Sequence, residues 1–373
     1  MPTIDLNARI IPIETRCWRL FPGSSYRFLD VFRHSEVAFL DMPGLVLPEG
    51  KLGQSKDLPK LIRRSEIVLE KLAKEGKEQA PTVTEDELKN FKVGRRRQRN
   101  QQALINFFDH AAKGDLIITP EPLYRGKILI GVFLDESNTA VEAKSPRHYG
   151  PTPVPARRIR WLKEIEENTV SSSLSQSLRH QHPFSLIERS RFPEVFSLAY
   201  DSFVYGERHS SVLFNRKVDY TDRETSLIGL VSSISAVFCE AVSTGDQDEI
   251  DLLTALLSQA SMEYHCQQAA DIHSPGFNRF ISSTATALVI AAFVASLSLL
   301  SACDSAESMT ATLANIDYVN SSAPADDACT ALVSETTDRI LKTIGSDKLW
   351  KMCQAMKDAE ARAGLESSAK IIK

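Results

Sequence analysis

The sequence lacks the short signatures by which many enzyme classes are recognised. None of its 8 histidines falls in an H-E-x-x-H motif, and it contains no P-loop and no G-x-G-x-x-G stretch. ATP-driven work would therefore have to come from a partner. We expect a protein that is not an enzyme, and the sequence predicts no catalytic residue, no cofactor and no metal site.

Cysteine is scarce and scattered, with 6 residues in 373 and no C-x-x-C pair or zinc-type Cys/His spacing. Such spacing predicts reduced, mostly buried thiols. The first residues show no apolar run behind a basic stretch, so no secretory signal is expected. Together these features predict a cytoplasmic protein. The cysteines are Cys17, Cys239, Cys266, Cys303, Cys329 and Cys353.

Charge is distributed unevenly along the chain, although the net charge is only −4. Residues 1–190 hold 30 Lys/Arg and 24 Asp/Glu, a balance of +6, whereas residues 191–373 hold 14 and 24, a balance of −10. A basic half can receive phosphates, and an acidic half repels them. Surface solubility and attraction between the halves explain the same asymmetry. Charge alone therefore does not distinguish a phosphate-binding half from an ordinary charged surface.

The pattern of residues 1–190 predicts a mixed α/β domain. Short apolar runs broken by Pro22-Gly23-Ser24 are typical of strand, turn and strand. An amphipathic helix is expected over 56–78, and a second helix follows the arginine run that starts at Arg95. Two strands are predicted at 115–120 and 127–133, and a basic strand at 157–162.

Residues 191–373 are predicted to form a mostly helical domain, which makes the whole chain an α+β protein of two domains. Gly364 is a natural residue to end the last helix. The expected helical segments are 193–206, 224–244, 247–270, 277–303, 326–344 and 346–363.

One apolar stretch leaves two interpretations open. Residues Ile281 to Cys303 carry no charge and are long enough to cross a bilayer as a helix. Their content of Ala, Ser and Thr makes insertion marginal and suits close helix packing equally well. The stretch is either a buried helix of a helical bundle or a membrane span, so an inner-membrane association is the alternative to a cytoplasmic location.

Three pieces of the N-terminal half resemble the EVE/PUA-like sensor domains of bacterial modification-dependent restriction and anti-phage proteins. They are WRLFPG (Trp18 to Gly23), the stretch from FFDHAAKGDLIITP to ILIGVF (Phe107 to Phe133), and VPARRIRWLKEI (Val154 to Ile165). The sequence departs from that pattern after ILIGV, where Phe133-Leu134-Asp135 stands in place of a glycine and aromatic residues.

The resemblance implies a small β-barrel with peripheral helices, whose mouth holds an extruded base, either modified or unmodified. A flipped base needs aromatic faces, polar readers of its edge and cations for the flanking phosphates. The candidate walls are Trp18, Phe21, Tyr26, Phe39, Tyr124 and Trp161, and the candidate polar reader is Asp41. The candidate phosphate contacts are Arg95, Arg96, Arg97, Arg99, Arg157, Arg158 and Arg160.

The leading hypothesis is an anti-phage defence protein that senses foreign or modified nucleic acid, most simply DNA. Its C-terminal half would signal by homo-oligomerisation or through a partner protein of the defence system. A second hypothesis is a membrane-perturbing effector that uses residues 281–303. A third is a divergent metal-dependent nuclease built on Asp135, Glu142 and Lys144, whose spacing is short for two adjacent strands.

Overall fold

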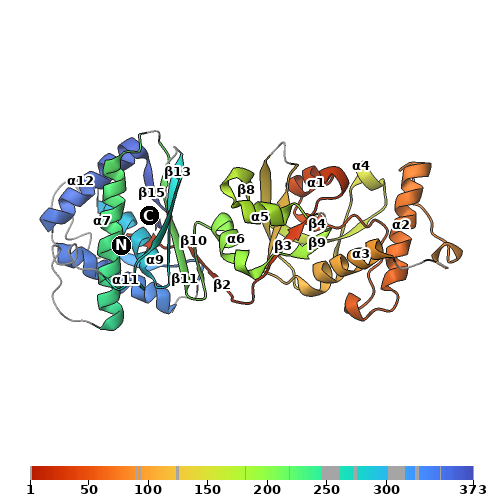
Figure 1. The fold of residues 1–373 in the computed structure, drawn as a ribbon, viewed down its shortest axis with the longest axis horizontal. Helices are drawn as coiled ribbons and strands as arrows, with labels where there is room; N and C mark the ends of the chain where they lie inside the picture. Colours follow the sequence, from red (N-terminus) through yellow and green to blue (C-terminus); the bar gives the residue numbers. More distant parts are fainter. Residues whose placement is uncertain are drawn as a thin grey trace. The chain divides into compact units, whose positions relative to one another are not determined.

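The computed structural model describes most of the chain: residues 2–89, 91, 94–122, 126–180, 182–217, 219–245, 260–271, 275–300, 316–323, 327–344 and 346–372. The chain divides into two compact units. We call Glu14–Ala199 the inner unit because it is the middle part of the sequence, and we call Met1–Ile13 together with Tyr200–Lys373, which flank it in the sequence, the outer unit. Both combine helices and strands, which confirms the α+β class (Figure 1).

The boundary between the units differs from the predicted division at residue 190. Strand β1 (Thr3–Asp5) pairs with two strands from the C-terminal part of the chain, and β2 (Ala8–Ile11) pairs in parallel with β10 (Ser202–Tyr205). Helix α6 (Phe192–Ala199) belongs to the inner unit. The first 13 residues therefore lie in the outer unit, because strand pairing at long sequence separation places them there.

The inner unit is built on a seven-stranded sheet of order β4-β8-β6-β5-β3-β9, with β7 paired to β8. The sheet curls into a half-barrel, in which one long strand, β8, pairs with β4 and β7 along its first part and with β6 along the rest. The strands are β3 (Cys17–Leu20), β4 (Val37–Phe39), β5 (Leu116–Pro120), β6 (Lys127–Phe133), β7 (Val141–Ala143), β8 (Val154–Glu166) and β9 (Phe184–Leu186).

A glycine marks the bend of this sheet. The register between β6 and β8 shifts at Ile130/Gly131, as expected for a β-bulge. A Cβ atom added at Gly131 would lie 2.6 Å from Ile159 Cγ2 and 2.7 Å from the Trp161 ring. Only glycine leaves room for these two side chains, so the curl depends on this position.

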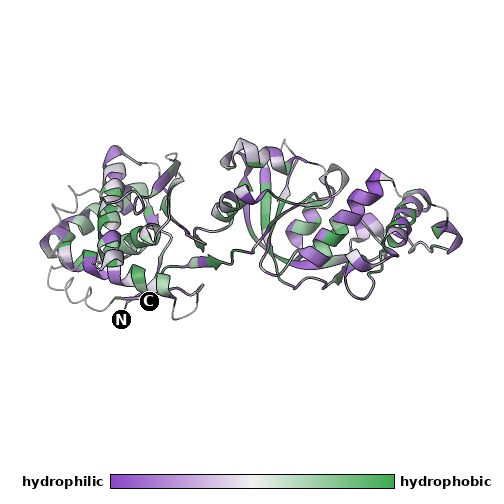
Figure 2. Ribbon diagram, turned by 60° about the horizontal axis from the view of Figure 1, so that its bottom comes forward, coloured by the Kyte–Doolittle hydropathy of each residue, from purple (hydrophilic) through white to green (hydrophobic). Residues whose placement is uncertain are grey.

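Helices and an aromatic core complete the inner unit. Phe28, Phe32, Phe39 and Phe107 are at most 1% exposed and belong to one apolar cluster. Hydrophilic and hydrophobic residues occur together along the helices of this unit (Figure 2), as expected of amphipathic surface helices. They are α1 (Leu29–His34), α2 (Leu58–Glu75), α3 (Arg95–Ile105), α4 (Pro146–Tyr149), α5 (Ser172–Leu178) and α6, with short 3₁₀ turns at Ser24–Tyr26, Leu52–Gln54, Asp86–Leu88, Glu167–Thr169 and Arg189–Arg191 and a π turn at Asn106–His110.

The outer unit contains two sheets beside its helices, which the prediction of a mostly helical C-terminal half did not include. A six-stranded sheet of order β12-β13-β11-β10-β2 also includes β15, and a three-stranded sheet has the order β14-β1-β16. The segments predicted as helices over 193–206 and 277–303 each include a strand. The strands are β11 (Arg208–Asn215), β12 (Gln267–Asp271), β13 (Gly276–Ser282), β14 (Asp317–Val319), β15 (Leu365–Ser367) and β16 (Lys370–Ile372).

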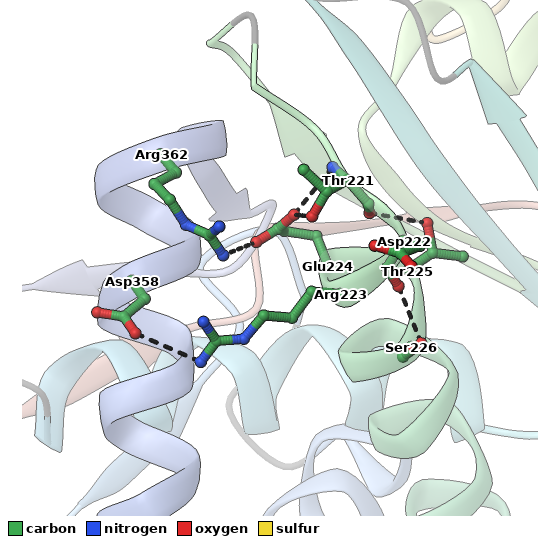
Figure 3. A network of polar contacts seen from close by, with 8 residues as sticks. All are labelled: Thr221, Asp222, Arg223, Glu224, Thr225, Ser226, Asp358 and Arg362. Atoms are coloured by element: carbon green, nitrogen blue, oxygen red, sulfur yellow. Dashed lines mark hydrogen bonds and ion pairs between the residues drawn. The ribbon is translucent and has the colours of Figure 1, made fainter.

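Three predicted helices of this unit are confirmed, namely α7 (Asp222–Thr244), α11 (Ala328–Ile344) and α12 (Ser346–Ala363). Gly364 follows α12 with a φ of 62°, the left-handed conformation expected at a helix end. The N-terminus of α7 carries a capping box, in which Glu224 accepts hydrogen bonds from Thr221. Arg362 of α12 pairs with the same carboxylate and joins the two helices (Figure 3).

The apolar stretch at 281–303 is not one continuous helix. Ile281 and Ser282 end β13, and the helix α9 covers Thr286–Leu300. Residues 301–303 lie outside the described residues. Ala287 to Leu297 are at most 2% exposed where they are apolar, because α9 packs against α7, α11, α12, β11 and β15. Its 15 residues are fewer than the roughly 20 that span a bilayer.

Among the described residues, one helix is long and apolar enough to cross a membrane by length and composition. It is α7, and half of the most apolar 18-residue stretch of this helix is buried inside the structure. Core helices of soluble proteins commonly pass the same test. The stretch that the sequence singled out for a membrane contains a different helix, α9, and this helix is buried at the centre of the outer unit.

Candidate ligand pocket and nucleic-acid interface

A pocket of about 350 Å³ opens in the inner unit where the segments after β3 and β4 meet helices α2 and α3. Four of the predicted site residues line it together, although they come from three separate parts of the chain: Phe21, Asp41, Arg96 and Arg99. The other lining residues are Gly23, Ser24, Leu40, Met42, Ile62, Ser65, Glu66, Leu69, Asn100 and Pro183.

The rim loop that follows β3 has an unusual backbone. Gly23 has a φ of 76°, and the non-glycine residues Ser25 and Tyr26 have φ values of 56° and 58°. Left-handed conformations at residues other than glycine are uncommon and cost on the order of 1 kcal/mol or more each. The Phe21 and Tyr26 rings pack at 4.9 Å between centroids. The loop therefore holds Phe21 in a fixed place at the cost of local strain.

Asp41, another residue that lines the pocket, is held by two donors. Arg27 Nη2 lies 2.6 Å from each carboxylate oxygen, and the Tyr149 hydroxyl donates to Oδ1 at 2.6 Å. Burial, followed by the nearby Asp41 charge, raises the pKa of Tyr149, so the phenol stays protonated as a donor. Among the described residues, Oδ2 accepts a hydrogen bond from Arg27 alone, and it keeps acceptor capacity for a ligand.

Ser65 contributes a buried polar group to the same pocket. It lies on α2 within the apolar stripe that also holds Ile62 and Leu69, and it is 1% exposed. Its Oγ has no hydrogen-bond partner among the described residues. A buried hydroxyl without a partner costs about 1–3 kcal/mol, so this position gains from a ligand atom that completes the bond.

The arginines at the start of α3 have different surroundings. Arg97 pairs with Glu66 of α2 at 2.6 Å, which fastens the two helices together. Arg95, Arg96 and Arg99 are exposed and, within the parts of the chain described, have no acidic partner. Of these three, Arg96 and Arg99 line the pocket and Arg95 does not.

The basic strand β8 presents two of its three arginines outward. Arg158 and Arg160 are exposed on the same face, as the alternation of a strand predicts. Arg158 also pairs with Asp135. Arg157 was predicted as a phosphate contact, and that prediction is wrong because its side chain is 0% exposed. It donates to the carbonyl oxygens of Phe107, Ala111, Asp135 and Glu136.

Four predicted aromatic walls do not line the pocket: Tyr26, which packs against Phe21, and three residues of the half-barrel. Trp18 is 2% exposed, stacks on Phe184 and donates to Asp115 at 2.8 Å. Phe39 belongs to the core of the inner unit. Trp161 is half-buried, and its indole N–H donates to the Ser35 carbonyl. They stabilise the half-barrel. Tyr124 lies outside the described residues.

The residues proposed for a nuclease do not form a metal-binding cluster. The Asp135 carboxylate is bound by Arg158, and Glu142 and Lys144 are exposed at β7 and just after it. In the described part of the chain, no group of three or more His, Cys, Asp and Glu side chains is placed to hold a metal ion. Hydrogen bonding by Arg158 lowers the pKa of Asp135, so this carboxylate stays ionised and its charge is balanced by the Arg158 guanidinium.

Sequence reasoning missed three residues of the site: Arg27, Ser65 and Tyr149. Ser65 had a detectable signal, because a serine interrupts the apolar stripe of a helix whose other buried positions are mostly apolar. Arg27 and Tyr149 had none, since they meet Asp41 only through the tertiary fold.

Fold and site together define a two-unit α+β protein with a small, partly cationic pocket in its inner unit. Comparison with protein-family models, with curated proteins and with solved structures gave no match in any of the three. The resemblance to EVE/PUA-like domains therefore stays a prediction from the sequence.

Proposed function

We propose that the inner unit binds nucleic acid and takes one base into the pocket between Phe21 and Asp41. The observation that carries this proposal is the meeting of an aromatic face, a fixed carboxylate acceptor and two exposed arginines in one pocket. A captured base needs these three elements: stacking, edge recognition and neutralisation of the adjoining phosphates.

The size of the pocket supports a ligand of this class. Small-molecule sites usually have about 300–1,000 Å³, and this pocket lies near the lower limit. A single nucleobase is a better match for it than a large cofactor. Its apolar lining of Leu40, Met42, Ile62 and Leu69 would cover the ring faces.

The pocket is also organised before any ligand binds. The strained rim loop fixes Phe21, while Arg27 and Tyr149 fix Asp41. Pre-organisation lowers the entropy lost on binding, and backbone strain is concentrated at functional sites in many proteins. On β8, the exposed Arg160 adds positive charge for contact with a nucleic-acid backbone, whereas the charge of the neighbouring exposed Arg158 is balanced by Asp135.

The wider role that we propose is a sensor of foreign or modified nucleic acid in bacterial anti-phage defence, with the outer unit signalling by oligomerisation or through a partner protein. Its support is the sequence resemblance together with the pocket. The membrane-effector alternative loses its main argument, since α9 is buried among other elements of the outer unit where the structure describes it.

The proposal is tested by fluorescence polarisation of the full-length protein with labelled single-stranded and double-stranded DNA and with RNA, over a series of salt concentrations. We expect the logarithm of the association constant to fall linearly with the logarithm of the salt concentration, because neutralised phosphates release counterions. Phe21→Ala and Asp41→Asn should each weaken it. Trp350→Ala, which removes an exposed aromatic side chain of the outer unit, is the matched control.

Two results would contradict nucleic-acid binding at this site. One is an affinity that is the same at low and high salt for every probe. The other is binding that Phe21→Ala weakens no more than Trp350→Ala does.

A further inference from the structure

We infer that the wall formed by α3 is a phosphate subsite, which orients the captured nucleotide with its phosphate on Arg96 and Arg99 and its base toward Ser65 and Asp41. This inference rests on the proposed function and adds the direction in which the ligand lies. It names the ligand as a phosphate ester of a nucleoside, either a free nucleotide or a nucleotide within a strand.

The N-terminal end of α3 is electrostatically open. Its N-cap is Gly94, no side chain of the described residues caps the helix, and its first turn holds no acidic residue. A helix of 11 residues presents unbonded N–H groups and a partial positive charge at this end, which attracts anions. Natural helices are usually capped by an oxygen-bearing side chain, and here a ligand oxygen can take that role.

The neighbouring side chains divide into one structural and two available cations. Arg97 is engaged with Glu66 and packs over the Phe91 ring at 5.0 Å, so it holds α3 in place. Its pairing neutralises Glu66, the carboxylate that would otherwise repel an anion from this wall. Arg96 and Arg99 remain beside the pocket, on consecutive turns of the same helix.

A second, independent feature of the pocket points to a ligand. Ser65 lines the same pocket from α2, is 1% exposed, and has an Oγ that finds no partner in the described residues. Asp41, with spare acceptor capacity on Oδ2, lines it from the segment after β4. One wall is thus suited to an anion, while two other positions are suited to the polar edge of an uncharged ring.

The experiment is isothermal titration calorimetry of the full-length protein with four kinds of probe: nucleosides, their 5′-monophosphates, the matching trinucleotides and inorganic phosphate. We expect a phosphate-bearing probe to bind about tenfold or more tightly than its nucleoside, the gain of one charge-assisted hydrogen bond or better. The double substitution Arg96→Ala/Arg99→Ala should abolish this difference. The control Arg95→Ala removes one arginine charge from the first turn of the same helix, at a residue that does not line the pocket, and it should preserve the difference in affinity.

Ser65→Val separates the two ends of the ligand. It should weaken nucleosides and phosphate-bearing probes by the same factor, because it removes a contact to the base and not to the phosphate. Thermal unfolding of the Arg96→Ala/Arg99→Ala protein should match that of the wild type, since both side chains are exposed.

Each outcome separates the subsite from the proposed function. Equal binding of monophosphates and trinucleotides, lost in the double variant, supports the subsite and identifies a terminal phosphate, whereas binding of trinucleotides alone identifies a phosphodiester. Trinucleotide binding that Phe21→Ala removes and the double variant leaves unchanged overturns the subsite and leaves the proposed function standing. Binding of monophosphates without any oligonucleotide overturns the proposed function and supports the subsite.

Discussion

Arg27 Nη2 lies 2.6 Å from both carboxylate oxygens of Asp41, so one guanidinium group fixes the orientation of the acidic side chain that lines the pocket. The Tyr149 hydroxyl completes the arrangement from the core side, at 2.6 Å from Oδ1. None of the three is adjacent in sequence to either of the others. Their meeting converts an ordinary surface aspartate into a positioned hydrogen-bond acceptor.

Removing the Tyr149 hydroxyl should therefore affect ligand binding more than the stability of the fold. For Tyr149→Phe we expect a loss of about 1 kcal/mol in the free energy of unfolding, the usual worth of one hydrogen bond, and a weaker affinity for the preferred nucleotide probe. Tyr220→Phe is the control, because it removes a tyrosine hydroxyl that accepts a hydrogen bond from the Asn278 amide in the outer unit. If both variants bind the ligand equally well, Asp41 does not need Tyr149 for its role.

Arg157 should be needed for folding and Arg160 should not. Arg157→Ala leaves four carbonyl oxygens without this donor, three of them in buried hydrogen bonds, so we expect a destabilisation of about 3 kcal/mol or more. Burial lowers the pKa of Arg157 to about 10, which still keeps it charged at neutral pH. Arg160→Ala, at an exposed position, should change stability by less than about 0.5 kcal/mol. Urea unfolding of both variants compares them, and similar midpoints would contradict a structural role for Arg157.

Glu224 makes the contact between α7 and α12 dependent on pH. Burial raises the pKa of this carboxyl, but hydrogen bonds from Thr221 and the Arg362 charge outweigh it and lower the pKa below 4.5. A lowered folded-state pKa stabilises the protein above the unfolded-state value, and this contribution is lost as pH falls through the folded-state value. Figure 3 shows the network.

We therefore expect Glu224→Gln to cost about 1–3 kcal/mol at pH 7 and progressively less below pH 4.5, where the wild-type carboxyl becomes protonated as well. Denaturant unfolding at several pH values measures the difference. Asp358→Asn, which alters the exposed pair with Arg223, should have little effect at any pH. A cost for Glu224→Gln that is constant over this range would show that the charge of Glu224 does not matter.

Helix α9 should tolerate no charge at its centre. Ala292 is 0% exposed, so Ala292→Asp buries a carboxylate with no prepared partner and should destabilise the outer unit by about 3 kcal/mol or more. Ser233→Asp places the same charge on an exposed position of α7 and should cost less than about 1 kcal/mol. Unfolding monitored by circular dichroism compares them.

The unmodified protein provides a second readout on the same helix. We expect recovery without detergent, because α9 is covered on its sides by α7, α11, α12 and the sheets of the outer unit. Retention of the protein in carbonate-washed membranes would show that the hydrophobic helices of this unit face lipid.

The sequence by itself determined the elements whose signals are local. Helices α2, α7, α11 and α12 follow from their apolar periodicity, and the turn after α12 follows from Gly364. The outward direction of Arg158 and Arg160 follows from the two-residue period of a strand. Four of the residues that line the pocket were also among the predicted candidates, since aromatic and charged residues beside turns are frequent in binding sites.

Only the tertiary structure decided which of these residues meet. Arg157 and Arg160 look alike in the sequence, yet one lies against buried carbonyl oxygens and the other faces solvent. The uncharged stretch at 281–303 divides into the end of a strand and a buried helix, because β13 pairs with β11 at a sequence separation of about 70 residues. Strand pairing at such distances depends on the whole chain, and apolar periodicity within a short window carries no information about it.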